Sequence, residues 1–400
     1  MQTTLLGLAI AFILALLAAL IGPYFVDWSR FRPQFEAEAT RVIGLPVRVQ
    51  GSIDARLLPT PSLRLRDVSL GARFDESNAR VAQLDVEFSL GSLVRGDWRA
   101  DELTLNGLAV DLGLDDSGRM EWASRPGMFN FGALTVDRLN VTGSLTFKDA
   151  ASRTLVSFDD VAFKGDVRTN AGAIRGDGTF VAMGSQYPFR LSTGRVIDGA
   201  GLRVHLAIDP GARPIAADLE GGLSFDDAVP RFDGALSVTR PIALKQGDAK
   251  ALETPWKITS KLKADPTSAR FEQVELSYGP DEAALKLGGI ADLRLGASPL
   301  LHGVLTARQL DADRVLARAN ATPDSPLQLL QKIGDLVAAV PLPPIPVQLE
   351  ASSDLIMLGG RPIQNAGADL RSNGKDWLIV SGMTAVLVRG GIGSKISSAI

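Results

Sequence analysis

The stretch Val47–Gly71, VRVQGSIDARLLPTPSLRLRDVSLG, shows the pattern that most of the chain repeats. Apolar and polar residues alternate in short runs, as in Val47-Arg48-Val49 and Leu63-Arg64-Leu65. Between the runs, Pro59 and Pro61 remove two N–H donors and bias the residues before them toward extended conformations. The stretch therefore predicts strand, turn and strand. We expect the turn residues Leu57, Leu58, Pro59 and Pro61 to form a rigid structural corner.

Similar alternating runs follow along the chain. One extends from Ala82 to Leu90, another from Leu108 to Leu114, and a third from Leu202 to Ile208. A period of two with one polar side predicts an antiparallel-rich sheet that faces water on one side. Turn signals such as Asp115-Asp116-Ser117-Gly118 and Asn170-Ala171-Gly172 separate the runs. The predicted fold class is therefore mainly β, without a repeat of fixed length.

Helical periodicity occurs at two places in the predicted sheet. Phe31, Phe35, Ala39 and Val42 follow one another at spacings of four, four and three, which predicts a short amphipathic helix. This helix could lie on a membrane surface or plug the open end of the sheet. Its few basic residues favour the plug. A helical insert is expected near 310–340, either capping the sheet or acting as a movable plug, and prolines then force an extended re-entry.

The N-terminus contains a candidate membrane anchor. Leu5 to Phe25 is a run of 21 residues without a charge, enough to span the hydrocarbon core of a bilayer. A cleaved signal peptide is the main alternative, but a basic residue before the run and an A-x-A site after it are not clear. A buried core helix is the second alternative. Arg30, Arg32 and Arg41 would by charge alone keep the chain in the cytoplasm, although long domains often translocate regardless.

The composition excludes several classes of function. The chain has 400 residues, a formal net charge of −3 and no cysteine. Such a balance is not typical of a nucleic-acid-binding protein. Without cysteine there can be no disulfide and no thiolate metal site.

Catalytic signatures are also missing from the sequence. His205 and His302 are the two histidines, and they lack the spacing of a metal site. The paired carboxylates Asp115-Asp116, Asp159-Asp160 and Asp226-Asp227 adjoin turn residues, where aspartate commonly bonds the backbone. There is no phosphate-binding loop and no G-x-S-x-G nucleophile elbow. We therefore expect no enzyme activity, no cofactor and no metal.

Several motifs together resemble the AsmA-like proteins of Gram-negative bacteria. They include Trp28 after the apolar run, G-x-P-V at Gly44–Val47, RLLPTPSL at Arg56–Leu63 and D-V-x-L-G at Asp67–Gly71. The run Ser92–Gly96 and D-x-x-G-R-x-x-W at Asp115–Trp122 resemble the same family. The resemblance covers most of residues 1–380 and has no catalytic motif to carry over.

This resemblance implies an inner-membrane protein, single-pass, with the bulk of the chain in the periplasm. It further implies an elongated, curled sheet whose apolar groove binds phospholipid acyl chains and supports outer-membrane lipid homeostasis or biogenesis. A filled β-sandwich would show the same alternation. The alternative function is a scaffold that binds an outer-membrane assembly client, for example by strand addition. Candidate groove-lining residues are Leu84, Val86, Phe88, Leu103, Leu105, Val110, Leu112, Val136, Val141, Val204 and Leu206.

The expected organisation has five parts. They are an anchor (1–26), an AsmA-like helix and strands (27–125), a continuation of the β-groove (126–309), a helical insert with proline-rich re-entry (310–346), and further strands that look truncated (347–400).

Overall fold

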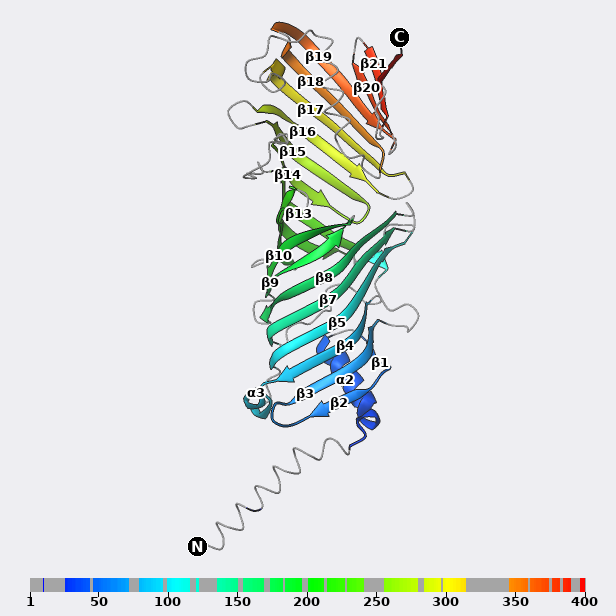
Figure 1. The fold of residues 1–400 in the computed structure, drawn as a ribbon, viewed down its shortest axis with the longest axis vertical. Helices are drawn as coiled ribbons and strands as arrows, with labels where there is room; N and C mark the ends of the chain where they lie inside the picture. The colour runs from blue at the N-terminus through cyan, green and yellow to red at the C-terminus, as the bar shows by residue number, and fades with distance from the viewer. Residues whose placement is uncertain are drawn as a thin grey trace, which may run out of the picture. The chain divides into compact units, whose positions relative to one another are not determined.

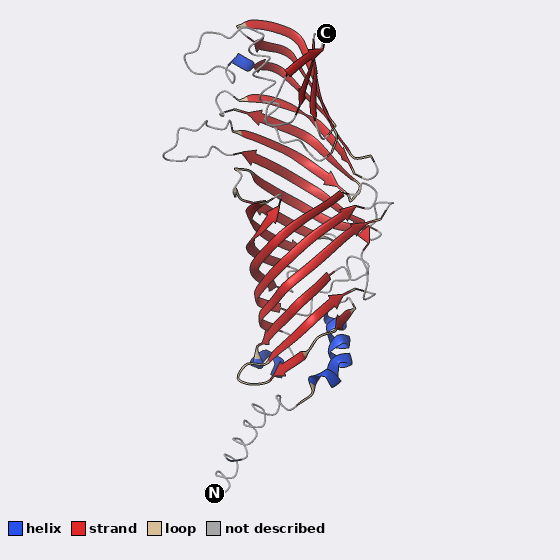
Figure 2. Cartoon of the chain, turned by 45° about the vertical axis from the view of Figure 1, so that its right-hand side comes forward, coloured by secondary structure: helices blue, strands red, loops and turns tan. Residues whose placement is uncertain are grey.

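The computed structural model describes a mainly β protein (Figures 1 and 2). The residues that it describes are 10, 26–43, 46–71, 79–95, 99–115, 120–121, 135–149, 154–168, 173–182, 184–195, 201–211, 214–226, 229–240, 255–279, 284–295, 298–313, 345–358, 360–373, 376–381, 384–389 and 396–399. The chain divides into two compact units. Unit 1 comprises residues 1–149, 154–212 and 224–230, and unit 2 comprises residues 150–153, 213–223 and 231–400.

The described helical elements are a 3-10 helix η2 (Trp28–Phe31), α2 (Arg32–Ile43) and α3 (Leu90–Arg95). The strands are β1 (Val47–Val49), β2 (Ile53–Arg56), β3 (Ser62–Leu70), β4 (Ala79–Phe88), β5 (Arg99–Leu114), β6 (Met120–Glu121), β7 (Thr135–Asp149), β8 (Thr154–Arg168), β9 (Ala173–Ala182), β10 (Ser185–Arg195), β11 (Leu202–Ile208), β12 (Ala216–Asp226), β13 (Val229–Arg240), β14 (Trp256–Ala264), β15 (Ser268–Tyr278), β16 (Leu285–Arg294), β17 (Leu300–Asp311), β18 (Val347–Leu358), β19 (Arg361–Ser372), β20 (Asp376–Ser381), β21 (Thr384–Arg389) and β22 (Ile396–Ala399).

Unit 1 is built on strands that pair in chain order. Strands β1 and β2 pair one after the other with β3, which pairs with β4, and β4 pairs with β5. The pairing of β5 with β7 is parallel, and antiparallel pairing then continues from β7 through β11. Strand β6 pairs with the end of β5. Figure 1 shows these strands following one another across unit 1.

Residues with positive φ interrupt the alternation of several unit 1 strands. They are Asp67 in β3 (φ 50°), Gly107 in β5 (φ 65°) and Asp160 in β8 (φ 47°). Residues i and i+3 of a regular strand lie on opposite faces. Local irregularities at these positions bring residues three apart, such as Leu105 and Leu108, onto the same apolar side.

The best-buried core of unit 1 lies at its first strands. Val49, Val68 and Val81 are 2–3% exposed there, and Trp28, Phe35 and Ala39 pack against this cluster. Helix α2 thus packs against the apolar core of the first strands. Phe31, assigned to the same helical stripe, is instead 45% exposed in η2 and contacts Trp28.

Unit 2 repeats this mode of pairing with other residues. Its strands pair antiparallel from β13 to β17, the pairing of β17 with β18 is parallel, and antiparallel pairing resumes through β22. Gln273 (φ 53°) has positive φ within a register shift between β15 and β16, and Asn365 (φ 51°) has positive φ within β19.

The mainly β fold and the strand–turn–strand prediction for Val47–Gly71 are confirmed, and Leu57–Pro61 connects β2 to β3. Four details of the sequence prediction are wrong. Leu90, predicted at the end of the alternating run from Ala82, instead begins helix α3 and is 50% exposed. Leu310 and Asp311 end strand β17 instead of starting a helix, and the predicted insert beyond residue 313 lies outside the described residues. Asp159 and Asp160 lie at a bulge within β8, not at a turn. Ala82 is exposed, because the alternation of β4 changes phase there.

The predicted anchor, Leu5–Phe25, also lies outside the described residues. Among the helices that the structure describes, none has the length and apolarity needed to cross a membrane.

Candidate functional site

The strand registers of unit 1 collect its apolar side chains on one side, which we call the unit 1 apolar face. Directly opposed residues of two paired strands point to the same face of the sheet. Following these pairs across β4–β11 gives a continuous set. It comprises Leu84, Val86, Phe88, Leu103, Leu105, Leu108, Val110, Leu112, Val136, Leu139, Val141, Leu145, Phe147, Val156, Phe158, Val161, Phe163, Val167, Ile174, Phe180, Tyr187, Phe189, Leu191, Leu202, Val204, Leu206 and Ile208.

The groove-lining residues that the sequence predicts are all members of this face. Val86 and Val136 are buried, at 7% and 2% exposure, within a cluster that also contains Ala100, Leu139 and Phe163. The other predicted residues are half-buried. A packed sandwich core would bury such residues almost completely. The face therefore combines a few buried positions with a larger half-open surface.

An aromatic cluster on β8–β10 was not predicted from the sequence. Phe180 lies between Phe158, Tyr187 and Phe189, at ring-centroid distances of 5.4, 5.6 and 5.7 Å. Phe163 stacks on Phe189 at 6.0 Å. Of the five rings, Phe163 is buried and the rest are half-buried. The cluster therefore presents aromatic surface on the unit 1 apolar face.

Glycine on the neighbouring strand makes room for these rings. A Cβ atom at Gly178 would lie 2.8 Å from Phe189 Cε1, and one at Gly176 would lie 2.6 Å from Phe163 Cζ. The rings thus lie directly over backbone. The sequence signal was the period-two pattern Gly176-x-Gly178-x-Phe180 opposite Tyr187-x-Phe189, which becomes informative once the β9–β10 register is known.

The opposite side of unit 1 is polar and crossed by ion pairs between neighbouring strands. Arg99 and Asp137 lie 2.8 Å apart, Arg138 and Glu102 3.2 Å, Lys148 and Asp111 3.3 Å, and Arg190 and Asp209 2.8 Å. The two sides of the strands thus differ sharply in polarity, as the alternating sequence predicts.

Unit 2 shows the same asymmetry. Register places Leu287, Leu293, Leu301, Leu305 and Leu349 on one side of its strands, where the described leucines are half-buried. The other side carries a row of polar side chains: Arg270 Nε lies 3.1 Å from Asp292 Oδ1, and His302 Nε2 lies 3.8 Å from Glu350 Oε1.

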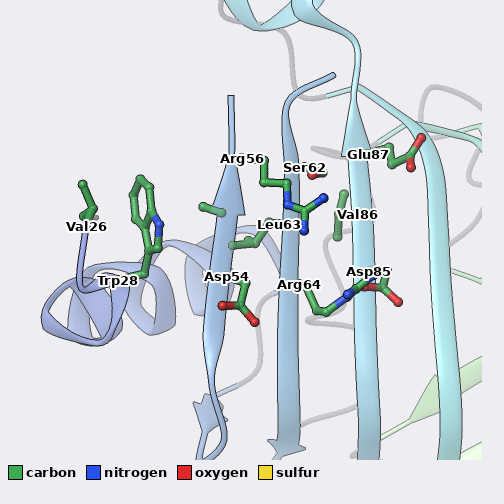
Figure 3. A pocket seen from close by; sticks show the side chains of 11 residues that line it. Val26, Trp28, Asp54, Arg56, Ser62, Leu63, Arg64, Asp85, Val86 and Glu87 are labelled. Atoms are coloured by element: carbon green, nitrogen blue, oxygen red, sulfur yellow. The ribbon is translucent and has the colours of Figure 1, made fainter. Parts of the chain in front are cut away.

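A pocket of about 390 Å³ lies at the start of the unit 1 strands (Figure 3). The Arg64 side chain points to Asp85 in this view, and their hydrogen bond raises the pKa of Arg64 above its ordinary value. The mixed charges suit a polar molecule or water better than an acyl chain. The lining residues are Val26, Trp28, Asp54, Ala55, Arg56, Ser62, Leu63, Arg64, Asp85, Val86 and Glu87.

The residues of the predicted corner differ in their exposure. Leu57 and Pro59 are exposed, Leu58 is half-buried and Pro61 is buried, where its carbonyl accepts a hydrogen bond from Phe88 N at 2.8 Å. His205 is exposed on the polar side of β11. Within the described ranges, no three histidine, aspartate or glutamate side chains gather in a way that could hold a metal ion.

Comparison with known proteins adds one decisive finding for the first part of unit 1. Residues 2–125 match the model of the AsmA family. This part of the chain is AsmA-like. The family resemblance of its N-terminal motifs is thereby confirmed. Neither the curated proteins nor the solved structures contain a significant match to the chain.

Proposed function

We propose that this AsmA-like chain is anchored in the inner membrane, extends into the periplasm, and binds phospholipid acyl chains on its apolar sheet faces. Its role would be to support lipid transfer toward, or lipid homeostasis of, the outer membrane. The observation that carries the proposal is the unit 1 apolar face, which is continuous from β4 to β11 yet largely half-open. The family match over residues 2–125 supports it.

Acyl chains suit this face for a simple energetic reason. Each methylene group removed from water contributes roughly 0.8 kcal/mol, without requiring directional contacts. The half-open aromatic cluster around Phe180 can cover such groups, while a headgroup remains in water beyond the strand ends. A lipid could slide along the face because neighbouring positions offer similar contacts. No bond is made or broken, which agrees with the expectation that the chain is not an enzyme.

Photo-crosslinking from two adjacent positions tests the lipid proposal. Leu206 lies on the unit 1 apolar face, and Ala207 lies on the opposite side of the same strand and is also half-buried. A photoreactive phenylalanine analogue would replace either residue in the full chain, expressed in cells and irradiated there. We expect mass spectrometry to find phospholipid attached at position 206 and far less at 207. Equal yields at both positions would contradict the proposal.

The same experiment examines the scaffold alternative. Crosslinks from position 206 to polypeptides, without attached lipid, would favour a protein that assists outer-membrane protein assembly.

The location proposal has its own test, which uses the lack of cysteine in the chain. Ala82 is exposed, so an Ala82→Cys variant carries one accessible thiol. We expect a membrane-impermeant maleimide to label it in cells with a permeabilised outer membrane and an intact inner membrane. Labelling that occurs only after lysis would place unit 1 in the cytoplasm.

A further inference from the structure

Three polar side chains of α2 bond to the backbone of the strand edge beside it. Thr40 Oγ1 accepts a hydrogen bond from Val47 N at 3.0 Å, and Glu36 Oε1 accepts one from Val49 N at 2.8 Å. One turn further back, Arg32 Nη2 donates to the carbonyl oxygen of Gly51 at 2.9 Å. The helix thus contacts a row of backbone groups, not only apolar side chains.

The spacing of these hydrogen bonds explains how side chains of one helix can bond to every second residue of an extended strand. Residues 32, 36 and 40 recur every four positions, about 6 Å along a helix axis. Residues 51, 49 and 47 recur every two positions, roughly 6.7 Å along a strand. The two repeats nearly coincide over this short length. One polar stripe of α2 can therefore follow every second residue of the edge.

These backbone groups are those that a further strand would use. Val47 and Val49 pair in register with Leu70 and Val68 of β3, yet their N–H groups bond to α2. An open edge of this kind is a template for pairing with another chain. Phe35 and Ala39 of the same helix also pack on the core cluster that contains both valines.

We propose that α2 is a surrogate strand: it masks the β1 edge, which without it pairs with β1 of a second copy of this chain. The second copy is the fitting partner because antiparallel pairing of β1 with itself is self-complementary. Val47 of each copy would face Val49 of the other and exchange the N–H and C=O groups that α2 now engages. Arg48 would then oppose Arg48, and this like-charge contact disfavours the dimer further. The inference does not depend on lipid binding.

The test compares two backgrounds of the full chain in its membrane, each with a single thiol from Arg48→Cys. Glu36→Leu with Thr40→Val removes both acceptors, whereas Glu36→Gln with Thr40→Ser keeps an acceptor at each position. Directly opposed residues of a non-hydrogen-bonded antiparallel pair lie about 4.5 Å apart at Cα, within disulfide range. We expect mild oxidation to give at least tenfold more disulfide-linked dimer in the first background.

Amide hydrogen exchange, measured on the reduced protein at a dilution at which it is monomeric, provides the second measurement. Removing the acceptors should accelerate exchange at Val47 and Val49 at least tenfold relative to the Gln/Ser background. Equal dimer yields, or unchanged exchange at both valines, would overturn the proposal. If the Leu/Val background does not accumulate, Thr40→Val is compared with Thr40→Ser alone, and equal exchange at Val47 in that pair would also overturn it.

Discussion

Two regions of unit 1, strands β1–β4 and strands β9–β11, differ in how their apolar residues are covered. At β1–β4, η2 and α2 pack against the strands, and Val68 and Val81 are 2% and 3% exposed. At β9–β11, Phe189, Leu191 and Leu206 are half-buried. The strands of both regions alternate in the same way. Alternation thus identifies an apolar face, but a covering element decides whether that face becomes a core or remains an available surface.

The largest effect is expected at the covered end. Val81→Asp would bury a carboxylate without a partner beneath α2, at a cost on the order of 3 kcal/mol or more. Ala82→Asp adds the same group at the adjacent, exposed position. We expect the Val81 variant to be degraded or to lose protease resistance, and the Ala82 variant to behave as the parent. Similar resistance of both variants would show that α2 does not close a core.

A smaller effect is expected at the aromatic cluster of the half-open region. Phe189→Ala removes a half-buried ring that contacts Phe163 and Phe180. Fully buried phenylalanines cost about 3–5 kcal/mol when truncated to alanine. We therefore expect roughly half of that range, measured by thermal or urea unfolding, together with weaker lipid crosslinking from position 206. Phe189→Leu should retain most of both properties. A loss of stability as large as that of a fully buried phenylalanine would mean that the cluster belongs to a closed core.

The open end should tolerate charge but lose function. Because Leu206 is half-buried, an aspartate there can remain hydrated, and we expect a stability cost of about 1 kcal/mol or less. Lipid crosslinking from the neighbouring face position Val204 should fall at least fivefold. Ala207→Asp, on the polar side near Arg190, is the matched control and should leave crosslinking unchanged. Unfolding of the Leu206 variant would place this residue in a closed core.

The smallest effect is expected at a turn of unit 2, outside both regions. Burial acts to raise the pKa of Asp265, but hydrogen bonds donated by the backbone and hydroxyl groups of Thr267 and Ser268 outweigh it, and the pKa is lowered. A lowered folded-state pKa stabilises the protein above the unfolded-state value of about 3.9, and this contribution disappears as pH falls through the folded value.

Asp265→Asn measures this contribution. We expect a slightly lower unfolding midpoint than that of the parent at pH 7, and a smaller difference below pH 4. Lipid crosslinking should not change at any pH. A difference that grows on acidification would contradict the sign of the pKa shift.

Strand positions were largely predictable from the sequence. Whether the apolar residues in the two halves of one strand share a face was not. Leu103 and Leu105 have odd numbers and Val110 and Leu112 have even numbers, so strict alternation would put these pairs on opposite faces. They share a face in the structure because the strand changes phase at Gly107, with a φ of 65°. The alternation pattern of the sequence cannot reveal such a bulge, because one inserted residue leaves the alternation regular on either side of it.

The candidate surface was predicted in part. Sequence alternation identified members on β4, β5, β7 and β11, but it missed the rings of Phe158, Phe163, Phe180, Tyr187 and Phe189. Their strands contain glycines at the positions that the rings cover, which weakens the apolar pattern. Only the register between strands brings rings from separate parts of the chain together.

The sequence by itself determined the mainly β class, the sites of the strands and the apolar stripe of α2, because these depend on the period of neighbouring residues. The tertiary structure alone decided which apolar residues are covered, which remain half-open, and that Arg32, Glu36 and Thr40 bond to a strand edge. These properties depend on what lies across from a side chain, and contacts between distant segments are not recorded in a local period.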